Sequence, residues 1–186
     1  TPLQLCMMTA QIANGGFAVK PKIIVDSNPI SYEDAKQSME SGLLFDTDSE
    51  ELLDKKLFKN QKNIKIIQEA MFASTNERFG TSYKSRIDDP KYQFAGKTGT
   101  AQVKRISKRE RELDLELEQI PYKDRDHALY VAYGPYVNPR YALSIIVEHG
   151  GSGSKAAAPI AKKLFKLIID RHDLRNKQSN FERITV

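Results

Sequence analysis

Three strand-like runs in the second half of the chain constrain the fold more than any other sequence feature. The runs cover residues 92–106, 128–133 and 141–148, and the last two are separated by the turn sequence Gly-Pro-Tyr-Val-Asn-Pro. A connection this short joins neighbouring antiparallel strands. We therefore expect the three runs to form an antiparallel meander.

A helix is expected directly after these strands, over about residues 155–170. The glycine-rich sequence GGSGS at 150–154 ends the last strand and caps this helix. The second half of the chain thus predicts an α+β fold, with an antiparallel sheet covered by helices. The large apolar side chains of the helix share one face, which we expect to lie on the sheet: Ile160, Leu164, Leu167 and Ile168.

Two more helices are expected in the first half of the chain. Thr1 is a helix cap, Pro2 suits the first helical position, and Asn14 followed by glycine marks the end. Because this helix has apolar residues on most of its faces, we expect it to be buried on most sides. A second helix is expected over about residues 63–74. Residues 26–60 are polar and irregular, with at most a hairpin or a small helix.

Composition and charge exclude several classes of function. With 186 residues and 40% hydrophobic content, the chain suits one compact unit. Its net charge of +5 is spread out, and residues 104–126 contain as many acidic as basic side chains. This stretch therefore favours a solvated loop or a small charged helix over a nucleic-acid-binding arm. The single Cys6 cannot form an internal disulfide, so we expect a buried, inert thiol.

The chain also lacks the sequence signals of membrane insertion and of cofactor binding. No run approaches the roughly 18 apolar residues of a membrane span, and no signal segment opens the chain, so we expect a soluble piece. Because it begins with Thr1 rather than Met, we expect a processed protein or an excised piece, with any anchor outside it. No metal or nucleotide cofactor is expected, since there is no phosphate loop and the histidines lack metal-site spacings: His127, His149 and His172.

The sequence FAGKTGTAQV at residues 94–103 is the strongest candidate for a binding site. On a strand, Lys97 and Gly99 would share one face, while Thr98 and Thr100 would share the other. An ammonium group and hydroxyl groups suit a carboxylate, and glycine lets a ligand lie against the backbone in strand-like pairing. The expected ligand is therefore an anionic, peptide-like molecule, although a Lys-Thr-Gly tripeptide also arises by chance in ordinary strands.

Together with its surroundings, this tripeptide resembles a known family. The segments TPLQL, GTSYKSRIDDPKYQFAGKTGTAQV and RDHALYVAYGPYVNPRYALSIIVEHGGSGSKAAAPIAKKL are similar to the latter part of the transpeptidase domain of class B penicillin-binding proteins. Within the family, the similarity is greatest to the elongation type, penicillin-binding protein 2. The resemblance implies the fold shared by penicillin-binding proteins and serine β-lactamases. It covers most of the chain and is weakest at residues 26–60 and 107–122.

The resemblance also implies a function. Proteins of this type are peptidoglycan D,D-transpeptidases, which cross-link stem peptides through a serine acyl-enzyme during cell-wall elongation and need no cofactor. The implied partners are stem peptides, β-lactam antibiotics and other cell-wall elongation proteins, but no nucleic acid. The parent protein would be anchored in the inner membrane, with its catalytic domain in the periplasm.

Site roles follow from the same resemblance, residue by residue. Lys97 would supply positive charge and assist the proton network near the catalytic serine. Thr98 and Thr100 would contact the carboxylate of the acyl-donor peptide or of a β-lactam. The N–H of Thr100 would be one of two oxyanion-hole donors, and Gly99 would keep the cleft open. The resemblance thus implies Lys97 and Thr100 as catalytic residues and all four as ligand-binding residues.

Two motifs of the family do not stand at their expected places. The nucleophile motif SxxK and the motif SxN should both precede Lys97, in a part of the protein before Thr1. Residues 1–186 are therefore expected to form a single unit, the C-terminal portion of a transpeptidase domain. Such a portion has no nucleophile, and we expect no activity from it alone.

Two segments fit these motifs as bare patterns only. Ser152–Lys155 fits SxxK, but it follows the Lys-Thr-Gly motif in a glycine-rich stretch. Ser74–Asn76 fits SxN, but it lies where the family leads into its Gly-Thr segment, which is Gly80-Thr81 in this chain. We expect neither segment to carry catalysis.

Alternative functions remain open at this stage. A non-catalytic peptide-binding or assembly module would use the same strand, and a β-lactamase or β-lactam sensor shares the Lys-Thr-Gly motif. Reading the coding sequence before Thr1 for SxxK followed by SxN separates these alternatives. In the family, two further strands complete the sheet beside the last one. We therefore also expect residues 143–147 to present a bare edge that pairs with another chain.

Overall fold

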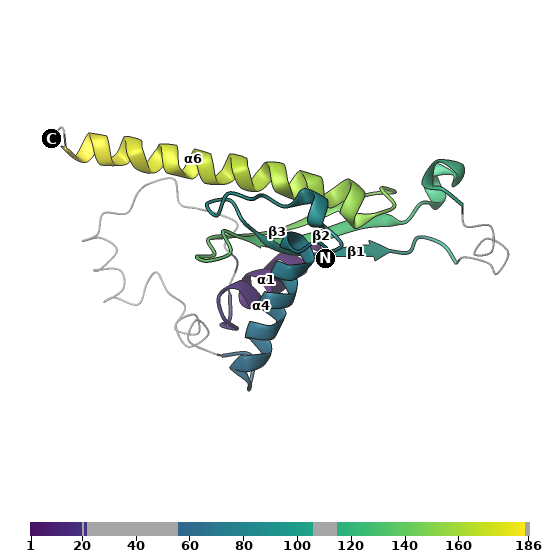
Figure 1. Cartoon of the computed structure of the whole chain (residues 1–186), viewed down its shortest axis with the longest axis horizontal. Helices are drawn as coiled ribbons and strands as arrows, with labels where there is room; N and C mark the ends of the chain where they lie inside the picture. The colour runs from purple at the N-terminus through teal and green to yellow at the C-terminus, as the bar shows by residue number, and fades with distance from the viewer. Residues whose placement is uncertain (20, 22–55, 106–114, 185–186) are drawn as a thin grey trace, which may run out of the picture.

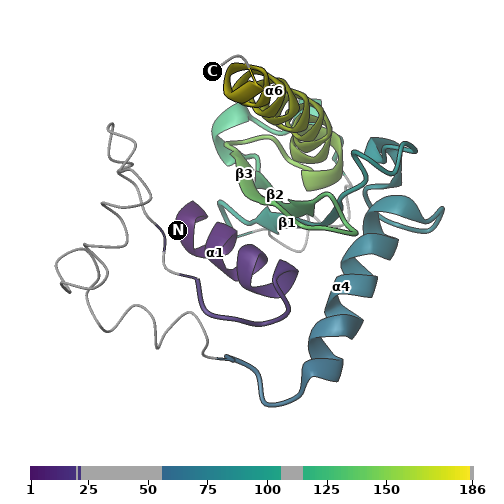
Figure 2. The same cartoon turned by 90° about the vertical axis from the view of Figure 1, so that its left-hand side faces the viewer.

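The computed structural model describes residues 1–19, 21, 56–105 and 115–184, with side chains up to residue 175. In this described part, a long C-terminal helix covers one face of a sheet and two helices lie on the other face (Figure 1 and Figure 2). This arrangement confirms the α+β class. The expectation for residues 26–60 falls almost entirely outside the described residues.

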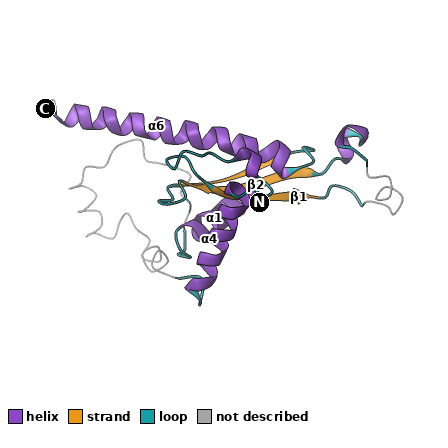
Figure 3. Ribbon diagram, in the orientation of Figure 1, coloured by secondary structure: helices purple, strands orange, loops and turns teal. Residues whose placement is uncertain are grey.

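The sheet is an antiparallel meander, as the sequence predicts. Its strands are β1 (Ala95–Ala101), β2 (His127–Gly134) and β3 (Tyr141–Val147), which Figure 3 draws in orange. They pair in the order β1-β2-β3. β1 is shorter than the predicted run 92–106, since the register places Ala101 opposite His127, the first residue of β2. Within the described part β3 is an edge strand, so its pairing with another chain stays a prediction.

Helix α1 (Pro2–Ala13) begins and ends where the sequence predicts. The Thr1 side chain accepts a hydrogen bond from the backbone N–H of Gln4 (3.3 Å), and the Gln4 side chain accepts one from the Thr1 ammonium group (2.8 Å). At the other end, the side-chain oxygen of Asn14 accepts a hydrogen bond from the backbone N–H of Phe17 (2.9 Å). The first contact pairs a backbone N–H that the helix leaves free at its start, and the last one fixes the turn that follows its end.

The prediction that α1 is buried on most sides was wrong. Only Thr9 and Ile12 of this helix are buried, whereas Leu3 is 48% and Met8 43% exposed. The physical reason is that α1 lays one side against β3 and β2, and no described element covers its outer side. The apolar residues on most faces of α1 therefore predicted more burial than the described residues provide.

Cys6 on the same helix is half-buried. Its thiol donates a hydrogen bond to the carbonyl of Ala142 in β3 (3.4 Å), and burial raises the pKa of this thiol. Because the thiolate is the reactive form, both observations fit the inert thiol that the sequence predicts.

Helix α4 (Gln61–Asn76) extends the predicted 63–74 helix by a few residues and packs against β1. It begins where the side chain of Asn60 accepts a hydrogen bond from the N–H of Lys62 (3.0 Å). Gln68 donates from its side chain to the carbonyl of Ile12 at the end of α1 (2.7 Å). The two helices below the sheet are thus tied to each other. The core on this side of the sheet contains Ile12, Met71, Ala95 and Tyr133.

Helix α6 (Ala158–Ile184) follows a π-helical turn at Gly153–Ala157 and is longer than predicted. The predicted buried face was partly wrong: Leu164 and Ile168 are half-buried, but Ile160 is 40% and Leu167 63% exposed. The face of α6 that packs on the sheet contains the small residues Ala158 and Ala161, which let the helix approach the sheet closely. The core between α6 and the sheet contains Phe94, Tyr130, Ala132, Ala158, Ala161, Phe165 and Ile169.

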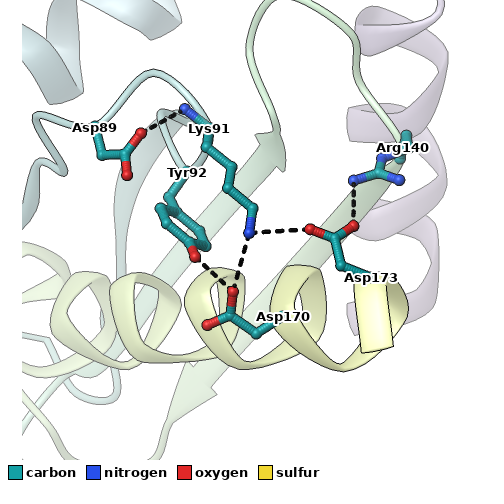
Figure 4. Close-up of polar contacts among 6 residues, drawn as sticks. All are labelled: Asp89, Lys91, Tyr92, Arg140, Asp170 and Asp173. Carbon is teal, nitrogen blue, oxygen red and sulfur yellow. Dashed lines mark hydrogen bonds and ion pairs between the residues drawn. The ribbon is translucent and has the colours of Figure 1, made fainter. Parts of the chain in front are cut away.

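A cluster of charged and polar side chains ties α6 to the segment before β1 (Figure 4). The Tyr92 hydroxyl and the Lys91 ammonium group (3.2 Å) both donate to Asp170, and Lys91 also reaches Asp173 (2.9 Å). Arg140, just before β3, lies 3.8 Å from Asp173. The hydrogen bond from Tyr92 lowers the pKa of Asp170, and the one from Lys91 lowers that of Asp173. We call these five residues the α6 latch.

Short 3-10 turns make up much of the remaining connections. They are η1 (Tyr83–Ser85), η2 (Leu117–Gln119) and η3 (Tyr122–Asp124). The charged stretch 104–126 is thus partly a loop with two short turns, while its residues 106–114 lie outside the described part.

Candidate active site

The Lys-Thr-Gly motif lies in β1, a strand that pairs with β2 on one side only among the described residues. Lys97 and Thr100 are exposed, whereas Thr98 and Gly99 are half-buried. The structure therefore brings all four predicted site residues to one strand at the edge of the sheet. An unpaired strand edge is a template on which an extended peptide can add as a further strand.

The side chains of the motif alternate between the two faces of the sheet, as predicted. Lys97 stands opposite Val131, which packs in the core beneath the sheet with α1 and α4. Thr98 stands opposite Tyr130, which packs in the core under α6. Directly opposite residues of an antiparallel pair project from the same face. Lys97 and Thr98 therefore approach the free edge from opposite faces.

Hydrogen bonds just before β1 show which backbone groups point to the free edge. The carbonyl of Gln93 accepts from the backbone N–H of Tyr136 (2.8 Å), on the side of β2 and β3. The carbonyl of Phe94 accepts from the side chain of Asn76 in α4 (2.9 Å), on the opposite side. Because these directions alternate along a strand, the backbone groups of both motif threonines point away from β2.

Lys97 lies along this free edge. Its ammonium group donates to the backbone carbonyl of Thr98 (2.8 Å), and it forms no ion pair with any described residue. A fixed positive charge beside outward backbone groups is suited to an anionic ligand that pairs with the strand.

Glycines allow close approach around the motif. A Cβ added to Gly99 would lie 3.3 Å from Cβ of Leu129 in β2, which is tight packing. A Cβ added to Gly153, at the start of the turn before α6, would lie 2.7 Å from the carbonyl oxygen of Gly99 and 2.4 Å from that of Leu129. The backbone of the turn before α6 therefore packs directly against the sheet at Gly99 of the motif.

A cluster of hydroxyl groups is buried behind the motif strand. The Tyr130 hydroxyl lies 2.9 Å from the hydroxyl of Thr75 in α4 and 3.0 Å from that of Ser82. A Cβ added to Gly96 would lie 2.3 Å from the same Tyr130 hydroxyl, so only glycine fits there. Burial raises the pKa of Tyr130, which keeps its hydroxyl protonated and able to donate. Sequence reasoning missed these hydroxyls, since the packing of α4 against the sheet is what brings Thr75 to Tyr130.

The structure shows the surroundings of the two segments that match SxxK and SxN as patterns. The Ser152 hydroxyl lies 3.0 Å from that of Ser154, and Lys155 is exposed. Asn76 uses its side-chain amide on the carbonyls of Phe72 (3.0 Å) and Phe94. Among the described residues, neither Ser74 nor Ser152 forms a hydrogen bond with a lysine amine.

The described residues contain neither a metal-binding cluster nor a helix that could span a membrane. Among the described residues, no three His, Cys, Asp or Glu side chains gather closely enough to hold a metal ion. No helix in the described ranges has the length and apolar character needed to cross a bilayer.

Comparison with known proteins identifies the family. The sequence model of the family described as penicillin binding protein transpeptidase domain matches residues 1–166. The chain is 36% identical over 105 residues to the peptidoglycan D,D-transpeptidase MrdA of Salmonella typhimurium, covering 56% of this chain and 16% of that protein. It is 31% identical over 163 residues to MrdA of Acinetobacter baumannii, covering 86% and 21%. The chain thus spans about a fifth of the length of these curated relatives or less.

Solved structures agree with the sequence comparison. The complex between PBP2 and MreC from Helicobacter pylori matches with a TM-score of 0.59 and 30% identity, covering 90% of this chain and 25% of that one. Pseudomonas aeruginosa PBP2 in complex with WCK 5153 matches with a TM-score of 0.58 and 27% identity, covering 90% and 30%. The chain therefore belongs to the penicillin-binding protein transpeptidase domain family, in its class B branch of the PBP2/MrdA type.

Proposed function

We propose that the protein containing this chain is a D,D-transpeptidase that cross-links peptidoglycan stem peptides in cell-wall elongation. The observation that supports this most is the free edge of β1, where Lys97 and both motif threonines meet in a chain of the PBP2/MrdA type. In this proposal, residues 1–186 are the C-terminal portion of the transpeptidase domain. The SxxK and SxN motifs then belong to an N-terminal portion outside this chain.

The reaction needs a nucleophile from that other portion. A serine oxygen attacks the carbonyl of the peptide bond between the last two residues of the donor stem peptide, and D-alanine leaves with the serine proton. An amine of a neighbouring stem peptide then attacks the acyl-enzyme, and the cross-link forms as the serine is released. No cofactor takes part in either step.

The described geometry suits recognition of the donor peptide by β1. The donor peptide lies along the free edge as an extra strand, and Gly99 leaves space beside its backbone. The hydroxyls of Thr98 and Thr100 and the ammonium group of Lys97 bind the terminal carboxylate. The outward N–H of Thr100 stabilises the oxyanion, a contact commonly worth about 3 kcal/mol in such sites. β-Lactams use the same contacts.

We also propose a partner and a location for the intact protein. Because a PBP2 of Helicobacter pylori forms a complex with MreC, we propose a partner of the MreC type for the intact protein. A membrane anchor would lie outside this chain and hold the catalytic domain in the periplasm.

The replacement Lys97→Ala in the intact protein tests the function. Loss of the exposed ammonium group removes charge but little packing, so we expect acylation by benzylpenicillin to slow by about 10²-fold or more. The measurement is the rate of covalent labelling, with the thermal unfolding midpoint as a check on folding. Lys155→Ala, at the exposed lysine before α6, is the matched control and should label within about twofold of wild type. Equal labelling of Lys97→Ala and wild type would exclude the proposed role.

A further inference from the structure

A row of hydroxyl groups leads from α4 to the motif strand. The hydroxyl of Ser74, near the end of α4, lies 3.2 Å from that of Thr81. The Thr81 hydroxyl in turn lies 3.4 Å from that of Thr98 in β1. These three residues come from a helix, a loop and a strand, and both contacts are exposed, unlike those of the buried Tyr130 cluster.

Close packing of the loop on α4 fixes this row. A Cβ added to Gly80 would lie 2.3 Å from the carbonyl oxygen of Ser74 and 2.5 Å from that of Ala73. Ser82, the residue after Thr81, donates to the Ser74 carbonyl from its backbone N–H and from its hydroxyl (both 3.0 Å). The backbone of Thr81 is therefore held between two anchored neighbours, which keeps its side chain beside Thr98.

The donors available in this row limit what Thr98 can do. Each hydroxyl has one proton to donate and two lone pairs that accept. If Ser74 donates to Thr81, and Thr81 to Thr98, the Thr98 proton is left for a ligand. A hydroxyl that already accepts a hydrogen bond is a stronger donor, because the chain polarises cooperatively. An anion at Thr98 favours this direction of the row over the reverse.

We propose that Thr81 and Ser74 are positioning residues that direct the Thr98 hydroxyl proton at the carboxylate of the donor peptide or of a β-lactam. This inference rests on the proposed function, since it assigns the ligand of Thr98. Neither residue touches the ligand. Thr81 acts directly on Thr98, and Ser74 acts through Thr81, so the effect of Ser74 is smaller.

The replacement Thr81→Val in the intact protein tests this inference. Valine keeps the branched shape but can neither donate to Thr98 nor accept from Ser74. We expect the dissociation constant of the non-covalent benzylpenicillin complex to rise about five- to tenfold, with the acylation rate constant changed less than about twofold. Saturation kinetics of covalent labelling separate the two constants. Thr81→Ser restores the hydroxyl and should return the dissociation constant to within about twofold of wild type.

A second ligand distinguishes positioning from a general structural effect. For the methyl ester of benzylpenicillin, which lacks the carboxylate charge, Thr81→Val and wild type should differ less than twofold. Equal weakening for acid and ester would overturn the inference, as would an unchanged dissociation constant for the acid. If Thr81→Val does not fold, Ser74→Ala provides the same comparison, with an expected two- to threefold effect on the acid alone. Failure of the wild-type protein to react with benzylpenicillin would instead contradict the proposed function.

Discussion

At the residue scale, Tyr130 links the motif strand to α4. Its side chain is fully buried, and its hydroxyl is shared between Thr75 and Ser82 behind Gly96. Tyr130→Phe leaves two buried hydroxyls with one partner fewer. We expect a loss of about 1–2 kcal/mol in the free energy of unfolding, seen as a lower unfolding midpoint of the intact protein. The exposed Tyr122→Phe is the control and should leave the midpoint unchanged.

The same residue predicts behaviour at alkaline pH. Burial raises the folded-state pKa of Tyr130 above its ordinary value near 10. The stability that the protonated Tyr130 hydroxyl contributes is fully present below the unfolded-state pKa. It is lost as pH rises through the higher folded-state pKa. The wild-type midpoint should therefore fall more steeply above about pH 10 than that of Tyr130→Phe. Parallel pH profiles for the two proteins would contradict the assignment.

At the element scale, the α6 latch stabilises the packing of residues 168–173 of α6 on the sheet. Asp170→Asn removes the charge that Lys91 and Tyr92 share, and Ile169 is the last buried residue of α6 among the side chains that the structure describes. We expect amide hydrogen exchange around residues 168–173 to become about two- to fivefold faster, since exposed ion pairs contribute little. Asp88→Asn, which breaks the separate Arg86–Asp88 pair, should leave exchange in α6 unchanged.

The latch also has a defined pH dependence. Hydrogen bonds from Tyr92 and Lys91 lower the folded-state pKa values of Asp170 and Asp173 below their ordinary range. The stability that the two ionised carboxylates contribute is present above the unfolded-state pKa. It is lost as pH falls through the lower folded-state pKa values. Exchange in α6 of the wild-type protein should thus approach that of Asp170→Asn below about pH 4. If the exchange rates in α6 of the two proteins still differed by the same factor at pH 2, the latch could not be the cause of that difference.

At the scale of the whole molecule, we propose that residues 1–186 form one side of the active site and contain no nucleophile. Incubation of this chain with excess benzylpenicillin should therefore add no drug mass to the intact protein, as measured by mass spectrometry. The two candidate serines support this expectation, because the hydroxyls of Ser74 and Ser152 each lie beside another hydroxyl rather than an amine. An adduct of one drug mass, abolished by Ser→Ala at either position, would overturn the proposed division of the active site.

The sequence by itself determined the strand order, the ends of α1, the alternation of Lys97 and Thr98, and the family. These features depend on local signals: turn residues, a capping box, the two-residue period of a strand and short motifs. Only the tertiary structure decided that Ala158 and Ala161 face the sheet in place of Ile160 and Leu167, because close approach depends on what lies opposite. It also decided that Thr81 meets Thr98, 17 residues away. A contact between two single polar side chains leaves no periodic pattern in the sequence, so packing alone creates it.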